Sequence, residues 1–85
     1  MPIFFEFHQM AEKQYRDQDY LKKLGKHIKS IREARGWSQE YFSNVCEIEI
    51  RQLGRIERAE TNSSISILKK IADKLNVAVS QLLDF

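Results

Sequence analysis

Three arginines are spaced in a way that could serve recognition of a planar ligand rich in hydrogen-bond acceptors. Arg51, Arg55 and Arg58 follow one another at intervals of four and three residues, which places them on one side of an α-helix. An arginine can donate two parallel hydrogen bonds to the O6 and N7 atoms of guanine in the major groove of DNA. The same side chains can instead solvate a helix face or pair with neighbouring glutamates. From these residues alone we favour this second interpretation.

Apolar residues recur every three or four positions along the chain, which predicts an all-α fold with short connections. We expect helices at about residues 20–34, 38–45, 50–58 and 64–75, with a short last helix from residue 80. Helix starts favour side chains that accept a hydrogen bond from a free amide. The expected caps are Asp19, Ser38, Ser64 and Ser80. Gly36 and Asn76 are expected at two helix ends, since both residue types tolerate the left-handed conformation.

The composition is that of a globular domain, with 42% hydrophobic and 31% charged residues among 85. Cys46 is the only cysteine and cannot form an internal disulfide. No apolar run approaches the roughly 20 residues of a membrane span, and the N-terminal MPIFFEF is too short for a signal peptide. We therefore expect an intracellular, cytoplasmic protein, associated with the nucleoid if it binds DNA, and no membrane partner.

Patterns typical of enzymes and metal sites are missing from the sequence. There is no glycine-rich phosphate loop and no nucleophile with a histidine placed by a recognised pattern. His8 and His27 have no metal-ligand spacing with Cys46. We expect no metal, no cofactor and no enzymatic activity.

Charge is unevenly distributed along the chain. Segment 21–35 holds six basic residues and one acidic residue. Such a run is either a solvated helix face or a surface that faces phosphate, and the run alone does not decide. Residues 1–20 are net acidic and contain Phe4, Phe5 and Phe7. These rings are expected to cover the domain's own core or to contact another subunit.

Three motifs occur in a specific order and spacing. They are R-x-x-x-G-W-S-Q-E at residues 32–40, R-I-E-R at 55–58 and I-L-K-K-I-A-D-K-L-N-V at 67–77. Together they resemble the helix-turn-helix domain of the phage lambda repressor and Cro type, the XRE-like family. The resemblance implies a five-helix, lambda-repressor-like bundle that binds duplex DNA, usually as a twofold dimer, with its third helix in the major groove. Residues 21–85 would form this domain, and residues 1–20 an N-terminal extension.

Carried over by position, the resemblance implies a recognition helix at about residues 50–58 and a set of contacts to DNA. Base edges would be contacted by Ile50, Arg51, Gln52 and Arg55. Phosphates would be contacted by Gln39, Arg58 and Asn62. Arg32 and Glu57 match a structural ion pair between the first and third helices. We expect dimerisation through the last helix and the N-terminal phenylalanines: Val79, Leu82, Leu83, Phe85, Phe4 and Phe7.

The sequence departs from the family pattern at several positions. Glu47 stands in the turn where the family usually has glycine, and Glu49 stands at the helix cap where it usually has Ser or Thr. Ala59 replaces a common helix-ending glycine, and Gly54 lies inside the recognition helix. Of these, the two acids Glu47 and Glu49 lie beside the expected DNA surface, where they would repel phosphate.

The sequence thus favours a sequence-specific, double-stranded DNA-binding transcriptional regulator, acting as a homodimer on an inverted repeat. The alternative is a protein-interaction module, an antitoxin-like scaffold that has lost DNA binding and joins partners through its apolar N-terminus. Relatives of this size include phage repressors, controllers of restriction–modification systems and antitoxins. The sequence does not choose among them.

Overall fold

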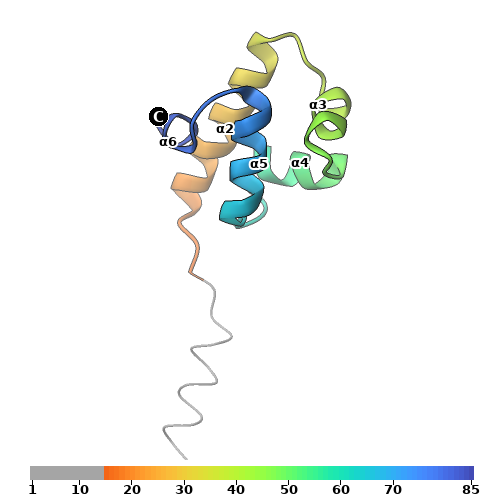
Figure 1. Cartoon of the computed structure of the whole chain (residues 1–85). Helices are drawn as coiled ribbons and strands as arrows, with labels where there is room; N and C mark the ends of the chain where they lie inside the picture. The colour runs from red at the N-terminus through yellow and green to blue at the C-terminus, as the bar shows by residue number, and fades with distance from the viewer. Residues whose placement is uncertain (1–14) are drawn as a thin grey trace, which may run out of the picture.

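A long helix near the start of the described chain supports four shorter ones. In the computed structural model, which describes residues 15–85, the elements are α2 (Gln18–Ala34), α3 (Gln39–Cys46), α4 (Ile50–Glu57), α5 (Ile65–Leu75) and α6 (Val79–Leu82). Within these residues there is no strand, so the expected all-α, five-helix fold is confirmed. Figure 1 shows α3 and α4 on one side of the molecule and α6 on the other, with α2 and α5 between them. Phe4 and Phe7 lie outside the described residues.

All five helices contribute side chains to one core. Its buried apolar residues are Leu24, Ile28, Phe42, Cys46, Leu53, Ile56, Leu68, Ile71, Ala72, Leu75 and Leu82. Burying a Leu, Ile or Phe side chain contributes about 1.5–3 kcal/mol relative to exposure. Burial also raises the pKa of the Cys46 thiol to about 11, as expected for a cysteine that packs as a small apolar residue.

None of the helices between residues 15 and 85 is long and apolar enough to cross a membrane.

Two of the expected helix caps are confirmed, and two are wrong. The Oγ atoms of Ser38 and Ser64 accept hydrogen bonds from backbone amides at 3.0 and 3.2 Å. At α2, however, the cap is Asp17, whose Oδ1 accepts from the Tyr20 amide at 3.0 Å. Asp19 lies inside the first turn, where its charge still suits the helix dipole.

The last helix begins one residue earlier than its expected cap. Ser80 lies inside α6, and Ala78 occupies the cap position without a side-chain hydrogen bond. Instead, the side chain of Gln81 reaches back, and its Oε1 accepts from the Ala78 amide at 2.8 Å. The start of α6 is therefore capped by Gln81, at the third position of the helix, and not by Ser80.

Helix ends use the left-handed backbone conformation, and two of them do so without glycine or asparagine. Gly36 and Asn76 have φ angles of 73° and 58°, as expected. Glu47 and Ala59 have φ angles of 57° and 59° at the positions where the family favours glycine. An L-residue with a Cβ pays about 1–2 kcal/mol in this conformation. The turn from α3 into α4 is therefore strained at Glu47.

Gly25 allows α2 to cross the end of α4 in backbone contact. A Cβ atom on Gly25 would lie only 2.5 Å from the carbonyl oxygen of Glu57 and 2.6 Å from that of Ile56. Any larger residue would push the two helices apart. This close crossing fixes where the last turn of α4 lies relative to the first half of α2.

Replacing Glu47 with glycine is expected to stabilise the domain. Glycine adopts positive φ without the Cβ clash, so the free energy of unfolding should rise by about 1 kcal/mol in urea denaturation. Glu47→Ala serves as the control, because it removes the charge but keeps the Cβ, and it should give no such gain. Equal stabilisation by both variants would show that charge, rather than backbone strain, is the cost at this position.

Candidate nucleic-acid interface

A buried ion pair joins α2 to α4. The Nε and Nη2 atoms of Arg32 donate to the two carboxylate oxygens of Glu57 at 2.8 and 3.0 Å. Both residues are buried, with 6% and 7% of their surface exposed. The remaining Nη1 atom donates to the Trp37 carbonyl oxygen at 2.7 Å, and the hydrogen bonding that Arg32 donates to Glu57 raises the pKa of Arg32. This bidentate ion pair holds the end of α4 at a defined angle to α2.

Gln39, at the start of α3, joins the same network. Its Nε2 atom donates to Oε1 of Glu57 at 2.9 Å, so Glu57 accepts hydrogen bonds from both α2 and α3. Gln39 was expected to contact phosphate, and in the structure its half-buried amide contacts a carboxylate. An amide nitrogen carries two hydrogens, and this bond occupies one of them. The other hydrogen is left to donate elsewhere.

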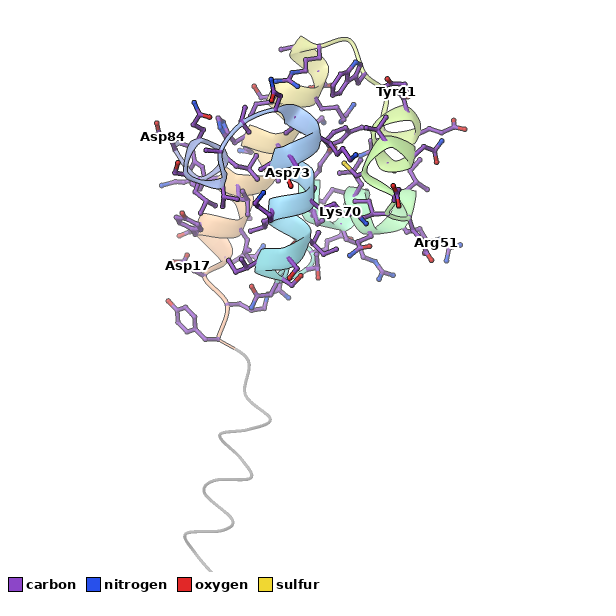
Figure 2. The ribbon with its side chains drawn as sticks, in the orientation of Figure 1. Asp17, Tyr41, Arg51, Lys70, Asp73 and Asp84 are labelled. Atoms are coloured by element: carbon purple, nitrogen blue, oxygen red, sulfur yellow. The ribbon has the colours of Figure 1, made fainter. Side chains whose placement is uncertain are left out.

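Three of the residues expected to read bases lie together on α4. Arg51, Gln52 and Arg55 line one hollow of about 470 Å³. Both arginines are exposed, and within residues 15–85 neither forms an ion pair. In Figure 2, Arg51 projects outward on the side of the molecule opposite to Asp84. The glutamate pairing that was the alternative for these two arginines does not occur in the described chain.

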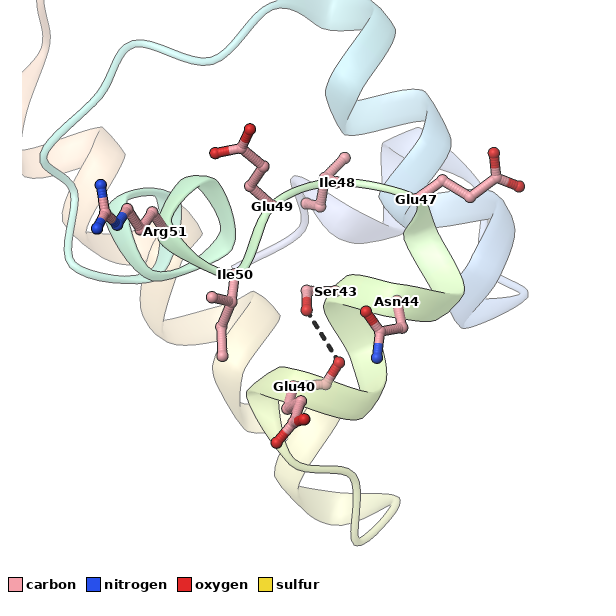
Figure 3. Close-up of a pocket in the computed structure, with 8 residues that line it drawn as sticks. All are labelled: Glu40, Ser43, Asn44, Glu47, Ile48, Glu49, Ile50 and Arg51. Atoms are coloured by element: carbon pink, nitrogen blue, oxygen red, sulfur yellow. Dashed lines mark hydrogen bonds between the residues drawn. The ribbon is translucent and has the colours of Figure 1, made fainter.

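The turn between α3 and α4 presents both apolar and acidic groups next to these arginines. Ile50, the first residue of α4, is 47% exposed. Figure 3 shows the side chains of Glu47 and Arg51 pointing away from each other at the two ends of the turn. Glu49 makes no cap hydrogen bond and lines the same hollow as Arg51. One carboxylate therefore lies beside the arginine face, whereas the other points away from it.

The two other residues expected on phosphate have partners in the chain. Nε of Arg58 donates to Oε2 of Glu60 at 2.8 Å, and Nη2 donates to Oε1 at 3.3 Å. The hydrogen bonds between the two side chains raise the pKa of Arg58 and lower the pKa of Glu60. The Nδ2 atom of Asn62 donates to the Tyr15 carbonyl oxygen at 3.1 Å. Both contacts are exposed to solvent, so they exchange readily for other partners.

The last helix supplies only part of the expected dimer surface. Leu82 is fully buried in the chain's own core, which corrects its expected place on an interface. Val79 and Leu83 are half-buried, and Phe85 is 44% exposed. The Phe85 ring lies 4.9 Å from the ring of Tyr20, centroid to centroid. An aromatic pair from α2 and the C-terminus is therefore exposed to solvent beside the last helix, whereas Leu82 is not.

Two side chains at the start of α2 and just before it make long-range contacts that the sequence did not indicate. Nη2 of Arg16 and Nε2 of Gln18 donate to the Ala59 carbonyl oxygen at 3.1 and 2.9 Å. Both residues were assigned to the N-terminal extension, yet they hydrogen-bond to the backbone just after the end of α4. No local pattern marks them, because the partner is more than forty positions away.

Within residues 15–85, no group of three or more His, Cys, Asp or Glu side chains could hold a metal ion.

Known proteins with similar sequences are regulators. A family model described as helix-turn-helix matches residues 28–82. The uncharacterized HTH-type transcriptional regulator YazB of Bacillus subtilis is 34% identical over 58 residues, which cover 68% of this chain and 84% of YazB. The HTH-type transcriptional regulator SutR of Escherichia coli is 38% identical over 53 residues, covering 62% of this chain but only 30% of SutR.

Solved structures with the same fold include two regulators of similar size. The restriction-modification controller protein C.AhdI from Aeromonas hydrophila superposes with a TM-score of 0.71 and 29% identity, covering 73% of this chain and 94% of that one. The hypothetical transcription factor NHTF from Neisseria superposes with a TM-score of 0.73 and 31% identity, covering 84% and 82%. The expected lambda-repressor-like fold is confirmed by these superpositions.

Breaking the Arg32–Glu57 pair is expected to destabilise the domain strongly. Arg32→Met leaves the Glu57 charge buried without its main partner, which should cost about 3–5 kcal/mol of unfolding free energy in urea denaturation. The double variant Arg32→Met/Glu57→Leu removes both charges and should recover part of that loss. Lys69→Met, which breaks the exposed pair with Asp73, is the control and should change little. An Arg32→Met protein with wild-type stability would contradict a structural role for the pair.

Proposed function

The chain belongs to the XRE/Cro-like helix-turn-helix family of DNA-binding transcriptional regulators, which are not enzymes, and we propose that it reads a specific duplex sequence with α4 in the major groove. The observation that carries this proposal is the pair of exposed arginines, Arg51 and Arg55, one turn apart on α4 and unpaired within residues 15–85. A guanidinium group without an internal partner is available to donate both of its parallel hydrogen bonds.

The base contacts follow from the chemistry of the first turns of α4. Arg51 and Arg55 each donate to O6 and N7 of a guanine, a contact worth about 1–3 kcal/mol of discrimination against the wrong base. Ile50, nearly half exposed, packs on the methyl group of a thymine. Gln52 is half-buried at the edge of the same surface, from which its amide reaches an adjacent base or phosphate.

The phosphate contacts come from both ends of the helix-turn-helix unit. Gln39 donates its second amide hydrogen to a phosphate at the start of α3, where the positive end of the helix dipole adds attraction. Arg58 and Asn62 hold phosphates beyond the other end of α4. Because the Arg58–Glu60 pair is exposed, a DNA phosphate replaces the Glu60 carboxylate at little cost.

We also infer that the regulator acts in the cytoplasm as a homodimer on an inverted repeat. Two copies joined around Val79, Leu83 and Phe85 would bury the exposed rings of Tyr20 and Phe85. Their recognition helices would then enter successive major grooves about 34–36 Å apart. The similarity to C.AhdI, a restriction-modification controller protein, supports a regulatory role for this domain.

Selection of bound duplexes from a random DNA pool tests the proposal. The wild type is expected to enrich a two-fold symmetric motif, and Arg51→Ala/Arg55→Ala is expected to lose that motif because its base contacts are gone. Lys69→Ala/Lys74→Ala on α5 removes the same charge elsewhere and is the matched control, which should enrich the wild-type motif.

Two results would contradict the proposal. If Arg51→Ala/Arg55→Ala enriches the wild-type motif, these arginines do not read bases. If the wild type enriches no motif at all, the domain is not a sequence reader, and the protein-interaction module becomes the better explanation.

A further inference from the structure

The crossing of α2 over the end of α4 brings together a second group of cations. Lys22 and Lys26 lie three residues before and one residue after Gly25, the point of backbone contact between the two helices. Their side chains therefore flank the C-terminal end of α4. A hollow of about 400 Å³ at this place is lined by Lys22, Lys26, Glu57, Arg58 and Ala59.

Arg16 approaches the same place from the chain that precedes α2. Its Nη2 atom donates to the Ala59 carbonyl oxygen at 3.1 Å, next to the bond from Gln18 at 2.9 Å. The same Nη2 atom donates to Oε1 of Gln18 at 3.2 Å, and since a guanidinium group has five hydrogens to donate, these two bonds leave most of them available. We call Arg16, Lys22, Lys26 and Arg58 the flank patch.

Of the acids near the flank patch, one is engaged by Arg32 and Gln39 and the other pairs with a single member of the patch. Glu57 is buried, and its two oxygens accept from Arg32 and Gln39. Glu60 pairs with Arg58. Within the part of the chain that the structure describes, neither Lys22 nor Lys26 pairs with a carboxylate. Lys22 and Lys26 therefore carry positive charge that no ion pair of the described residues neutralises, whereas Arg58 shares its charge with Glu60.

The length of α4 places this charge near the DNA backbone when the helix lies in the groove. Its eight residues span about 12 Å at about 1.5 Å per residue. The major groove is also about 12 Å wide. When the first turn of α4 contacts base edges, its last turn lies beside the phosphates that border the groove.

We propose that the flank patch binds DNA backbone phosphates, so that α2 and Arg16, two residues before it, contribute to the DNA interface together with α3 and α4. This inference rests on the proposed function and adds Arg16, Lys22 and Lys26 to its phosphate contacts. Phosphate contacts set affinity and register without reading sequence. The flank patch therefore strengthens binding to every duplex and leaves the preferred motif unchanged.

Binding measured against salt concentration tests this inference. Fluorescence anisotropy would follow the wild type, Lys22→Ala/Lys26→Ala and a matched control on the duplex that the wild type enriches. The slope of log K against log salt is negative, and its magnitude should decrease by about 1.8 in the double variant, roughly 0.9 for each lost contact. Affinity should fall about ten-fold or more near physiological salt. The control, Lys23→Ala/Lys69→Ala, removes two lysines that do not line the hollow and should keep the wild-type slope.

A second variant isolates the arginine. Arg16→Gln keeps a donor for the Ala59 carbonyl oxygen while it removes the charge, so the fold should be retained. The slope should fall by about 0.9. Thermal unfolding of each variant is measured alongside, because cations near Ala59 also stabilise the carbonyl end of α4.

The possible results separate this inference from the proposed function. Wild-type affinity and slope in Lys22→Ala/Lys26→Ala would overturn the flank patch, while loss of the motif in Arg51→Ala/Arg55→Ala would still support base reading by α4. Weaker binding with an unchanged slope and a lower melting temperature would also overturn it, since the lysines would then only stabilise α4. If the wild type binds duplexes without sequence preference, the proposed function fails, and the salt slopes of the same variants on any one duplex still decide whether the flank patch holds phosphates.

Discussion

The buried contact between Arg32 and Glu57 determines how α4 is presented to solvent. Two charges removed from water cost several kcal/mol each unless their hydrogen-bonding groups are satisfied. Here Glu57 accepts from Arg32 and Gln39, and Arg32 also donates to Trp37. The network therefore connects α2, α3 and α4 at one point, and the backbone contact at Gly25 fixes the separation of α2 and α4 beside it.

This fixed orientation divides α4 into two faces with different tasks. An isolated helix of eight residues is too short to be stable in water. The inward face, with Leu53, Ile56 and Glu57 buried, supplies the stability that the helix lacks alone. The outward face is then free to carry Arg51 and Arg55, two charges that contribute little to folding. On the proposed function, the buried face holds the exposed face at the angle that the groove requires.

Local chemistry allowed much of this arrangement to be predicted from the sequence. Ser38, Ser64 and Asn76 act as expected because capping and left-handed turns depend on adjacent residues. The start of α2 was missed because Asp17 and Asp19 are equally good caps, and distant bonds to Ala59 favour the earlier start. The roles of Gly25 and Arg16 were also missed because they depend on residues far away in the sequence. Their partners are carbonyl groups at the end of α4, which no pattern of neighbouring side chains reveals.

The most direct test of α4 as the DNA-reading element is an NMR titration of the isotope-labelled protein with the duplex that it enriches. If α4 lies in the groove, the side-chain Nε–H signals of Arg51 and Arg55 should shift strongly, and the amide of Ile50 should shift with them. The amides of α6 and the Phe85 ring should move much less at the same DNA ratio. Large shifts confined to α6 and Phe85, with the arginine signals of α4 unchanged, would contradict this arrangement.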